Sequence, residues 1–181
     1  MNRVITCLLL CFSTSLFAEN KVELRVAAFM PQKQLFRDIY GDVLPNYQLE
    51  ISRTLCSPWE AFANIGFLYK KGHVHGCGSS KIWVVDITLG PKYNFCISRC
   101  LDFYLGAGIC LGGAHVNNKF CCSNKETAFI LGGKIKTGFN FFLENNLYFD
   151  LFLDYFYEEA FFSNRVNIGG LNAGLGMGWP F

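Results

Sequence analysis

The chain has 181 residues and a formal net charge of +2; 51% of its residues are hydrophobic and 17% are aromatic. Beyond the amino terminus, no apolar run approaches the roughly 18 residues that a membrane-spanning helix requires, so the apolar content indicates strands. The small net charge, without a basic patch interleaved with aromatic residues, argues against a nucleic-acid partner. A chain of this length is expected to form one domain.

The first segment has the pattern of an export signal. Arg3 supplies a basic start, residues 4–12 form an apolar run, and Ala18 is a small residue suited to cleavage. We therefore predict a signal peptide over residues 1–18. Neither cysteine of this segment follows the small residue usual before a lipidated cysteine, so a lipoprotein is the less favoured alternative.

The remainder, residues 19–181, reads as alternating strands and connections. Eight strands are predicted near residues 22–29, 47–55, 59–69, 81–94, 101–112, 127–142, 147–157 and 166–181. The connections between them are long and short in turn, which places every short turn at one end of an up-and-down sheet. The sequence thus predicts an eight-stranded antiparallel up-and-down transmembrane β-barrel domain.

Side-chain alternation separates each strand into two faces. One face is apolar, as in Trp83, Val85, Ile87 and Leu89, and Arg53 is its only charged member away from strand ends. The opposite face carries the charges Glu23, Arg25, Glu50, Glu60, Asp86, Lys92, Asp102, Lys134, Lys136, Asp150 and Asp154. Because charged groups facing lipid are costly, we expect these residues to line the lumen and to form a charge network there.

The last stretch, residues 169–181, reads GGLNAGLGMGWPF. Leu175, Met177, Trp179 and Phe181 alternate with small residues, so this strand has one large apolar face. The pattern resembles the closing strand of bacterial outer-membrane β-barrels of the OmpA and OmpX kind, although Pro180 departs from it. The resemblance implies that these four residues form an assembly signal captured by the barrel assembly machinery, and that outer-membrane lipid surrounds the protein in the cell outer membrane.

An eight-stranded barrel has room for side chains or one small ligand, so an open pore is not expected. We interpret the protein as structural or adhesive, without enzymatic activity and without a cofactor. One alternative is a lipid-modifying outer-membrane enzyme, for which His73, His75, Ser79, Ser80 and His115 supply suitable residue types. Another is a carrier for a small apolar ligand, suggested by the inward residues Phe62, Leu68, Phe152 and Phe156.

The long connection over residues 30–46 is unusually apolar and is expected to fold over the barrel mouth or to contact a partner. The loops with His73, His75, Cys77, His115, Cys121 and Cys122 contain zinc-ligand residue types, but no standard metal spacing, so no metal site is predicted.

Seven cysteines follow the signal segment, and the predicted topology sorts six of them into two groups. Cys56, Cys96 and Cys100 belong to the short-turn end, whereas Cys77, Cys121 and Cys122 belong to the long loops. A spanning strand covers about 25 Å of apolar height, so disulfides between the groups are excluded. Cys96 with Cys100, and Cys77 with Cys121 or Cys122, are candidate pairs, and Cys110 is expected to be a packed thiol. This composition resembles the cysteine-rich, crosslinked envelope of chlamydia-like bacteria and implies disulfide-linked envelope proteins as possible partners.

Overall fold

The computed structural model describes residues 19–74, 78–119, 123–143, 146–162 and 165–181, so the predicted signal peptide lies outside the described residues. The elements are β1 (Asn20–Pro31), α2 (Gln34–Tyr40), β2 (Leu44–Cys56), β3 (Trp59–Val74), β4 (Gly78–Ser98), β5 (Leu101–Lys119), β6 (Ser123–Phe142), β7 (Tyr148–Phe161), β8 (Arg165–Asn167) and β9 (Gly170–Pro180). Within this part of the chain, no helix has the length and apolar character needed to cross a membrane.

The strands form one closed ring. Each strand from β1 to β7 is antiparallel to the next, and β9 pairs with both β7 and β1, so eight strands complete the barrel. β8 is an additional short strand beside β7. Closure leaves no open sheet edge inside a membrane, where unpaired backbone groups would be costly. The predicted eight-stranded up-and-down barrel is confirmed.

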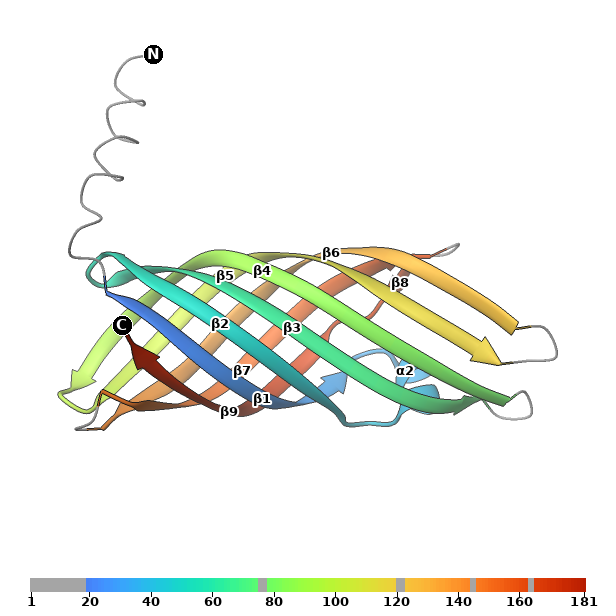
Figure 1. Ribbon diagram of the computed structural model, residues 1–181, viewed down its shortest axis with the longest axis horizontal. Coiled ribbons are helices and arrows are strands. Elements are labelled where there is room, and N and C mark those ends of the chain that lie inside the picture. Colours follow the sequence, from blue (N-terminus) through green and yellow to red (C-terminus); the bar gives the residue numbers. More distant parts are fainter. Residues whose placement is uncertain (1–18, 75–77, 120–122, 144–145, 163–164) are drawn as a thin grey trace, which may run out of the picture.

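The two ends of the barrel differ (Figure 1). One end holds Phe181, whose backbone pairs with Asn20, together with the turns that join β2 to β3, β4 to β5 and β6 to β7. We call it the turn end. The opposite end, which we call the mouth end, holds α2 and the far ends of the β3–β4 and β5–β6 hairpins.

The hairpins at the mouth end are longer than expected. β3 and β4 stay paired as far as Val74 and Gly78, and β5 and β6 as far as Lys119 and Ser123. The prediction of long loops over residues 70–80 and 113–126 is therefore wrong for most of these residues, which belong to strands. Polar residues end the apolar pattern there, but the backbone hydrogen bonds of the sheet do not depend on that pattern.

The predicted last strand, residues 166–181, is divided into β8 and β9. Ile168 donates its backbone N–H to the Glu158 carbonyl, and Gly169 donates to the side chain of Asn167, so the chain bends away from strand geometry. A Cβ atom on Gly169 would lie 2.4 Å from the Phe156 carbonyl oxygen. Only glycine fits this close backbone approach.

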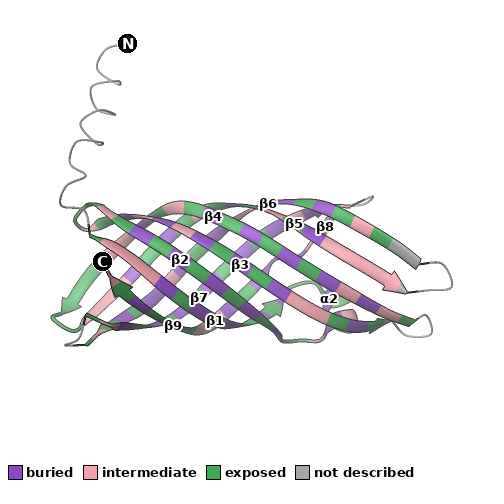
Figure 2. Ribbon diagram, in the orientation of Figure 1, coloured by how far each residue is buried: buried purple, intermediate pink, exposed green. Residues whose placement is uncertain are grey.

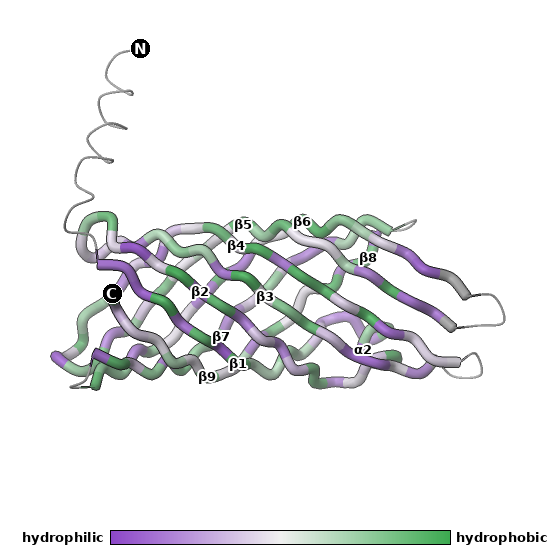
Figure 3. Tube along the Cα trace, viewed as in Figure 1, coloured by the Kyte–Doolittle hydropathy of each residue, from purple (hydrophilic) through white to green (hydrophobic). Residues whose placement is uncertain are grey.

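The barrel wall is apolar outside and polar or tightly packed inside. Along each strand, buried and exposed residues alternate (Figure 2), and so do hydrophilic and hydrophobic residues (Figure 3). On β5, Leu105, Ile109 and Leu111 are exposed, whereas Tyr104 and Cys110 are buried. Arg53 faces outward next to the turn end, where its side chain can reach the interface.

Aromatic pairs mark both edges of the apolar belt. The rings of Trp59 and Tyr93 lie 4.9 Å apart near the turn end, and those of Tyr69 and Trp83 lie 4.4 Å apart toward the mouth end. Trp59 and Tyr69 are ten residues apart on β3. At about 3.3 Å per residue and a tilt of about 40°, this separation gives a belt of about 25 Å, the height typical of outer-membrane barrels.

Candidate functional site

Inward side chains divide the lumen into two layers. The layer toward the turn end is ionic and contains Lys21, Glu23, Arg25, Glu50, Glu60, Lys92, Lys134, Lys136, Asp150 and Asp154. The layer toward the mouth end is an apolar cluster of Phe29, Phe36, Tyr40, Leu44, Leu68, Ile82, Val84, Ala114, Ala128, Ile130, Ala160 and Ile168. The sequence predicts a polar, salt-bridged lumen with some inward apolar residues; the structure places the ion pairs in the turn half and gathers the apolar residues into a hydrophobic core in the mouth half.

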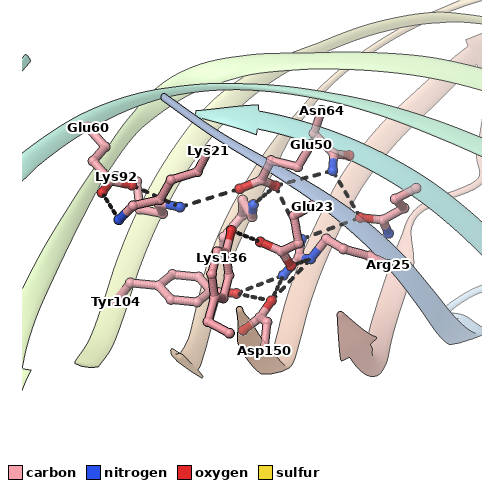
Figure 4. A network of polar contacts seen from close by, with 12 residues as sticks. Lys21, Glu23, Arg25, Glu50, Glu60, Asn64, Lys92, Tyr104, Lys136 and Asp150 are labelled. Atoms are coloured by element: carbon pink, nitrogen blue, oxygen red, sulfur yellow. Dashed lines mark hydrogen bonds and ion pairs between the residues drawn. The ribbon is translucent and has the colours of Figure 1, made fainter. Parts of the chain in front are cut away.

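Arg25 on β1 is the centre of the ionic layer (Figure 4). Its guanidinium lies 2.7 Å from Asp150 and 3.2 Å from Asp154, both on β7, and 2.9 Å from Glu23. It also donates a 2.7 Å hydrogen bond to the Tyr104 hydroxyl on β5. Arg25 is fully buried, so each of these contacts replaces hydration that the guanidinium has lost.

Three lysines neutralise the remaining acids near the turn end (Figure 4). Glu50 pairs with Lys136 and, at 3.5 Å, with Lys92. Glu60 pairs with Lys92 at 3.1 Å and with Lys21 at 2.7 Å. Lys21 precedes the predicted first strand and so is not among the predicted lumen charges, although it has the same parity as the inward Glu23 and Arg25.

The fourth lysine, Lys134, donates a 2.9 Å hydrogen bond to Asn64 and lies 3.7 Å from Asp154. The layer therefore contains five carboxylates, of Glu23, Glu50, Glu60, Asp150 and Asp154, and five cations, of Lys21, Arg25, Lys92, Lys134 and Lys136. Formal charge is balanced. These contacts join strands on opposite sides of the ring, so side chains fill this half of the lumen.

The inward aromatic residues belong to the same packing. The Arg25 guanidinium lies 3.6 Å from the centroid of the Phe152 ring, and Lys136 and Lys134 lie 4.4 Å and 4.3 Å from the rings of Phe62 and Phe156. Such contacts stabilise desolvated cations. The three aromatic residues that suggested an apolar ligand therefore pack against lumen cations.

Two residues of the predicted lumen charge network, Asp102 and Asp86, lie outside the ionic layer. Asp102 is half-buried at the turn end, opposite Cys96, and Asp86 makes no ion pair within the described residues. Asp86 instead lines a small cavity of about 20 Å³ with Asn46 and Glu158, large enough for a single water molecule. Glu158 is buried and inward-facing, but the predicted strand ends at residue 157, so Glu158 falls in a predicted connection.

Helix α2 closes the mouth end of the lumen. Phe36 and Tyr40 are its buried residues, and both belong to the apolar cluster. The Ser80 hydroxyl donates to Asn118, so the Tyr40 hydroxyl must donate the 2.7 Å hydrogen bond to Ser80. Burial raises the pKa of Tyr40 and keeps this hydroxyl protonated. The apolar content of residues 30–46 is thus explained by a helix that packs into the barrel.

A row of basic residues follows the outer wall beyond the aromatic pair Tyr69 and Trp83. Lys71 on β3 lies directly opposite Lys81 on β4. On the next strands, Asn117 of β5 lies between Lys81 of β4 and Lys125 of β6, opposite both. We call Lys71, Lys81 and Lys125 the lysine row. The nearby acid of β6, Glu126, has the inward parity. Like charges directly opposite each other on a sheet are destabilising, so this row favours an anionic contact.

The described cysteines are free thiols: Cys56, Cys96 and Cys100 are exposed and Cys110 is buried. The candidate pair Cys96 and Cys100 is not bridged: the strand pairing places Cys96 opposite Asp102, and Cys100 lies in the turn beyond Ser98. The Cys96 thiol donates instead to the Ser98 carbonyl. Cys77, Cys121 and Cys122 lie outside the described residues.

The residues of the predicted assembly signal all face outward from the closing strand. Leu175, Met177 and Trp179 on β9 are exposed, and so is Phe181 beyond the end of the strand. Val22 lies opposite Trp179 on one side of β9, and Phe149 lies opposite Met177 on the other. The strand that completes the ring therefore presents a continuous apolar face to the surroundings.

The residue types of a lipid-modifying enzyme are not brought together in the described part of the chain. Ser80 faces inward and bonds to Tyr40 and Asn118, whereas His115 bonds to Thr127 at 3.0 Å. His73 and Ser79 lie opposite each other on β3 and β4, and His75 lies outside the described residues. No Ser, His and acid side chains therefore form a hydrogen-bonded triad within this part.

A closed antiparallel barrel with a lipid-compatible wall, aromatic girdles and an ion-paired lumen is a transmembrane β-barrel, and it places the protein in the cell outer membrane. No protein-family model matches the sequence, and comparison with curated proteins gives no match.

Solved structures share the fold. Neisserial surface protein A (NspA) matches with a TM-score of 0.68 and 15% identity over 90% of this chain and 97% of that protein. OprG from Pseudomonas aeruginosa matches with a TM-score of 0.65 and 13% identity over 91% and 96%. Ail, the attachment invasion locus protein of Yersinia pestis, matches with a TM-score of 0.59 and 16% identity over 91% and 99%. The chain is thus similar to small bacterial outer-membrane β-barrels.

Proposed function

We propose that this protein is a structural and adhesive barrel of the outer membrane, without enzymatic activity, whose lysine row binds an anionic polysaccharide outside the cell. The observation that carries the proposal is the row itself: Lys71 and Lys81 face each other directly and take part in no ion pair among the described residues. A multivalent anion would relieve their repulsion. The filled ionic layer argues against a transport function for the lumen.

The similarity to Ail supports this choice of ligand. A second Ail structure, with a TM-score of 0.57 and 15% identity to this chain, is a complex with the heparin analogue sucrose octasulfate. For this protein, the lysine row would offer the corresponding electrostatic attraction. The proposal requires the mouth end to face outward, so that the short turns lie in the periplasm.

The proposal is tested by measuring heparin binding to the protein in lipid nanodiscs at low and moderate salt. Lys71→Glu and Lys81→Glu should each weaken binding several-fold, and added salt should weaken the wild type, because exposed charges are screened. Arg99→Glu removes an exposed cation from the turn end and serves as the matched control. Equal losses in the control and the two lysine variants would contradict the proposal.

The Lys71→Glu variant separates binding from folding. It creates a Glu–Lys pair across β3 and β4, which should stabilise the barrel by roughly 0.2–1 kcal/mol while heparin binding falls. Weaker heparin binding together with lower barrel stability would instead indicate a folding defect.

Two partner classes complete the proposal. The barrel assembly machinery would capture the apolar closing strand by edge pairing, and exposed Cys56, Cys96 and Cys100 would allow disulfide bonds to other envelope proteins. Non-reducing peptide mapping checks the second point: disulfide-linked oligomers are expected, and their absence would remove the crosslinking role. A Cys56–Cys121 bond within one chain would contradict the barrel topology.

A further inference from the structure

The barrel wall has a seam near the mouth end between β1 and β9. These strands pair up to Pro31 and Gly170, and the Gln32 N–H donates the next hydrogen bond to the Gly169 carbonyl. Beyond this point, the chain after β1 turns into α2, whereas β8 pairs only with β7 among the described strands. Among the described residues, no backbone pairing joins α2 to β8, and Val166 packs against the apolar cluster that contains Phe36 and Tyr40.

A cavity of about 700 Å³ occupies this seam. Its apolar lining comprises Leu35, Phe36, Ile39, Tyr40, Ile82, Val116, Phe162, Val166 and Ile168. Ile82 and Val116 belong to β4 and β5, so the cavity extends from the seam across the mouth end of the lumen. Its volume lies within the range of pockets that hold one small ligand.

The cavity also reaches the outside of the wall. Tyr157 and Glu159 line it, and both belong to the outward row of β7 that begins with the lipid-facing residues Leu151 and Leu153. Along this row, Tyr155, Tyr157 and Glu159 follow the apolar Leu151 and Leu153, and the exposed Phe161 lies beyond them. Because tyrosines of this kind mark the interface in outer-membrane barrels, the opening is placed at the boundary between hydrocarbon and head groups.

The polar rim is suited to an anionic head group. Lys33 before α2 and Arg165 on β8 lie on the two sides of the seam, and both are exposed. The one acid of the rim, Glu159, accepts a hydrogen bond from Tyr157. Two cations against one carboxylate give the rim a net positive charge. Deeper in the lining, the Tyr40 hydroxyl is already bonded to Ser80, so a polar solute would lose hydration while gaining few partners.

We infer that this cavity binds a single-chain amphiphile with an anionic head group, such as a fatty acid, whose chain enters sideways from the outer leaflet. The acyl chain lies between α2 and β8 toward Val116, and the head group stays at the rim between Lys33 and Arg165. The site is distinct from the lysine row, and it takes up one chain without opening the ionic layer below.

A photoactivatable long-chain fatty acid tests this inference on the full protein in lipid nanodiscs. Crosslinks are expected on α2, on β8 and near Val116. Val116→Phe fills the cavity and should reduce crosslinking at these sites by roughly tenfold. Val85→Phe makes the same change on the lipid-facing wall and should leave crosslinking unaltered.

The head-group contribution is measured separately. Arg165→Glu should weaken capture of the fatty acid several-fold but leave a matched long-chain alcohol unaffected. Crosslinks confined to outward residues such as Leu151 and Leu153 would show ordinary surrounding lipid and overturn the inference. Unchanged cavity crosslinking in Val116→Phe would overturn it as well.

Discussion

Arg25 shows how a single residue holds the interior of this barrel together. Its guanidinium contacts acids from β1 and β7, a hydroxyl from β5 and the ring of Phe152. A buried ion pair contributes little net stability compared with a well-packed apolar pair, but removal of one partner leaves a desolvated charge. Removing one charged residue of the network should therefore lower stability more than replacing the whole network by well-packed apolar residues would.

Arg25→Leu should lower the free energy of unfolding by about 3–5 kcal/mol, because Asp150 loses its nearest cation in a buried site. Urea unfolding of the protein in lipid vesicles measures the change. Arg99→Leu, at an exposed turn position, should change stability by less than about 0.5 kcal/mol. Adding Asp150→Asn to Arg25→Leu should restore part of the loss, and a double variant no more stable than the single one would contradict this account.

At the scale of elements, α2 depends on a close approach to β3. A Cβ atom on Gly72 would lie 2.2 Å from the Ile39 carbonyl oxygen and 2.8 Å from the Tyr40 ring. The helix has seven residues, too few to be stable alone, so its contacts with the barrel maintain it. Glycine at position 72 is therefore a requirement for the closed mouth.

Gly72→Ala should displace α2 and destabilise the fold by about 1–3 kcal/mol through overpacking. Limited trypsin digestion should then cut faster at Lys33 and Arg37, which flank and lie within the helix. Gly113→Ala is the control, since a Cβ atom there meets nothing closer than 3.8 Å. Equal cleavage rates in the two variants would show that α2 does not rely on Gly72.

The closing strand belongs to the same scale. Because β9 must pair with β1 and β7 to close the ring, its terminal apolar residues should matter more for assembly than for the stability of the finished barrel. Phe181→Ala should reduce the amount of protein inserted in cells, whereas Phe141→Ala, also outward-facing, should not. Fractionation of outer membranes measures the difference, and normal insertion of Phe181→Ala would contradict the assembly-signal role.

The strands of the wall could be predicted from the alternation of side chains, because a strand with lipid on one side must place apolar residues at every second position. The same rule identified Arg25, Glu50 and Asp150 as inward residues. It could not reveal α2, whose packing depends on the distant Ser80 and Gly72. It also assigns Leu68 and Ile130 to the inward face, but Leu44 precedes the predicted second strand, so the full apolar cluster of the mouth half is seen only in the closed ring.

At the scale of the whole molecule, the barrel is inside-out relative to a soluble protein. Apolar side chains cover its wall, charges neutralise one another in the lumen, and α2 covers the mouth end. Both adhesion at the lysine row and capture of an acyl chain at the seam require that the wall faces lipid, with the membrane ending at the aromatic girdles. That orientation is the central claim.

Tryptophan fluorescence tests it directly, because all three tryptophans of the chain, Trp59, Trp83 and Trp179, are exposed on the outer wall. In vesicles of brominated lipids, bromine near the head-group end of the acyl chain should quench them strongly and bromine near the chain terminus should quench them less. Acrylamide in the aqueous phase should quench weakly. Strong quenching by acrylamide, with none by brominated lipid, would show that the wall faces water and would contradict the account.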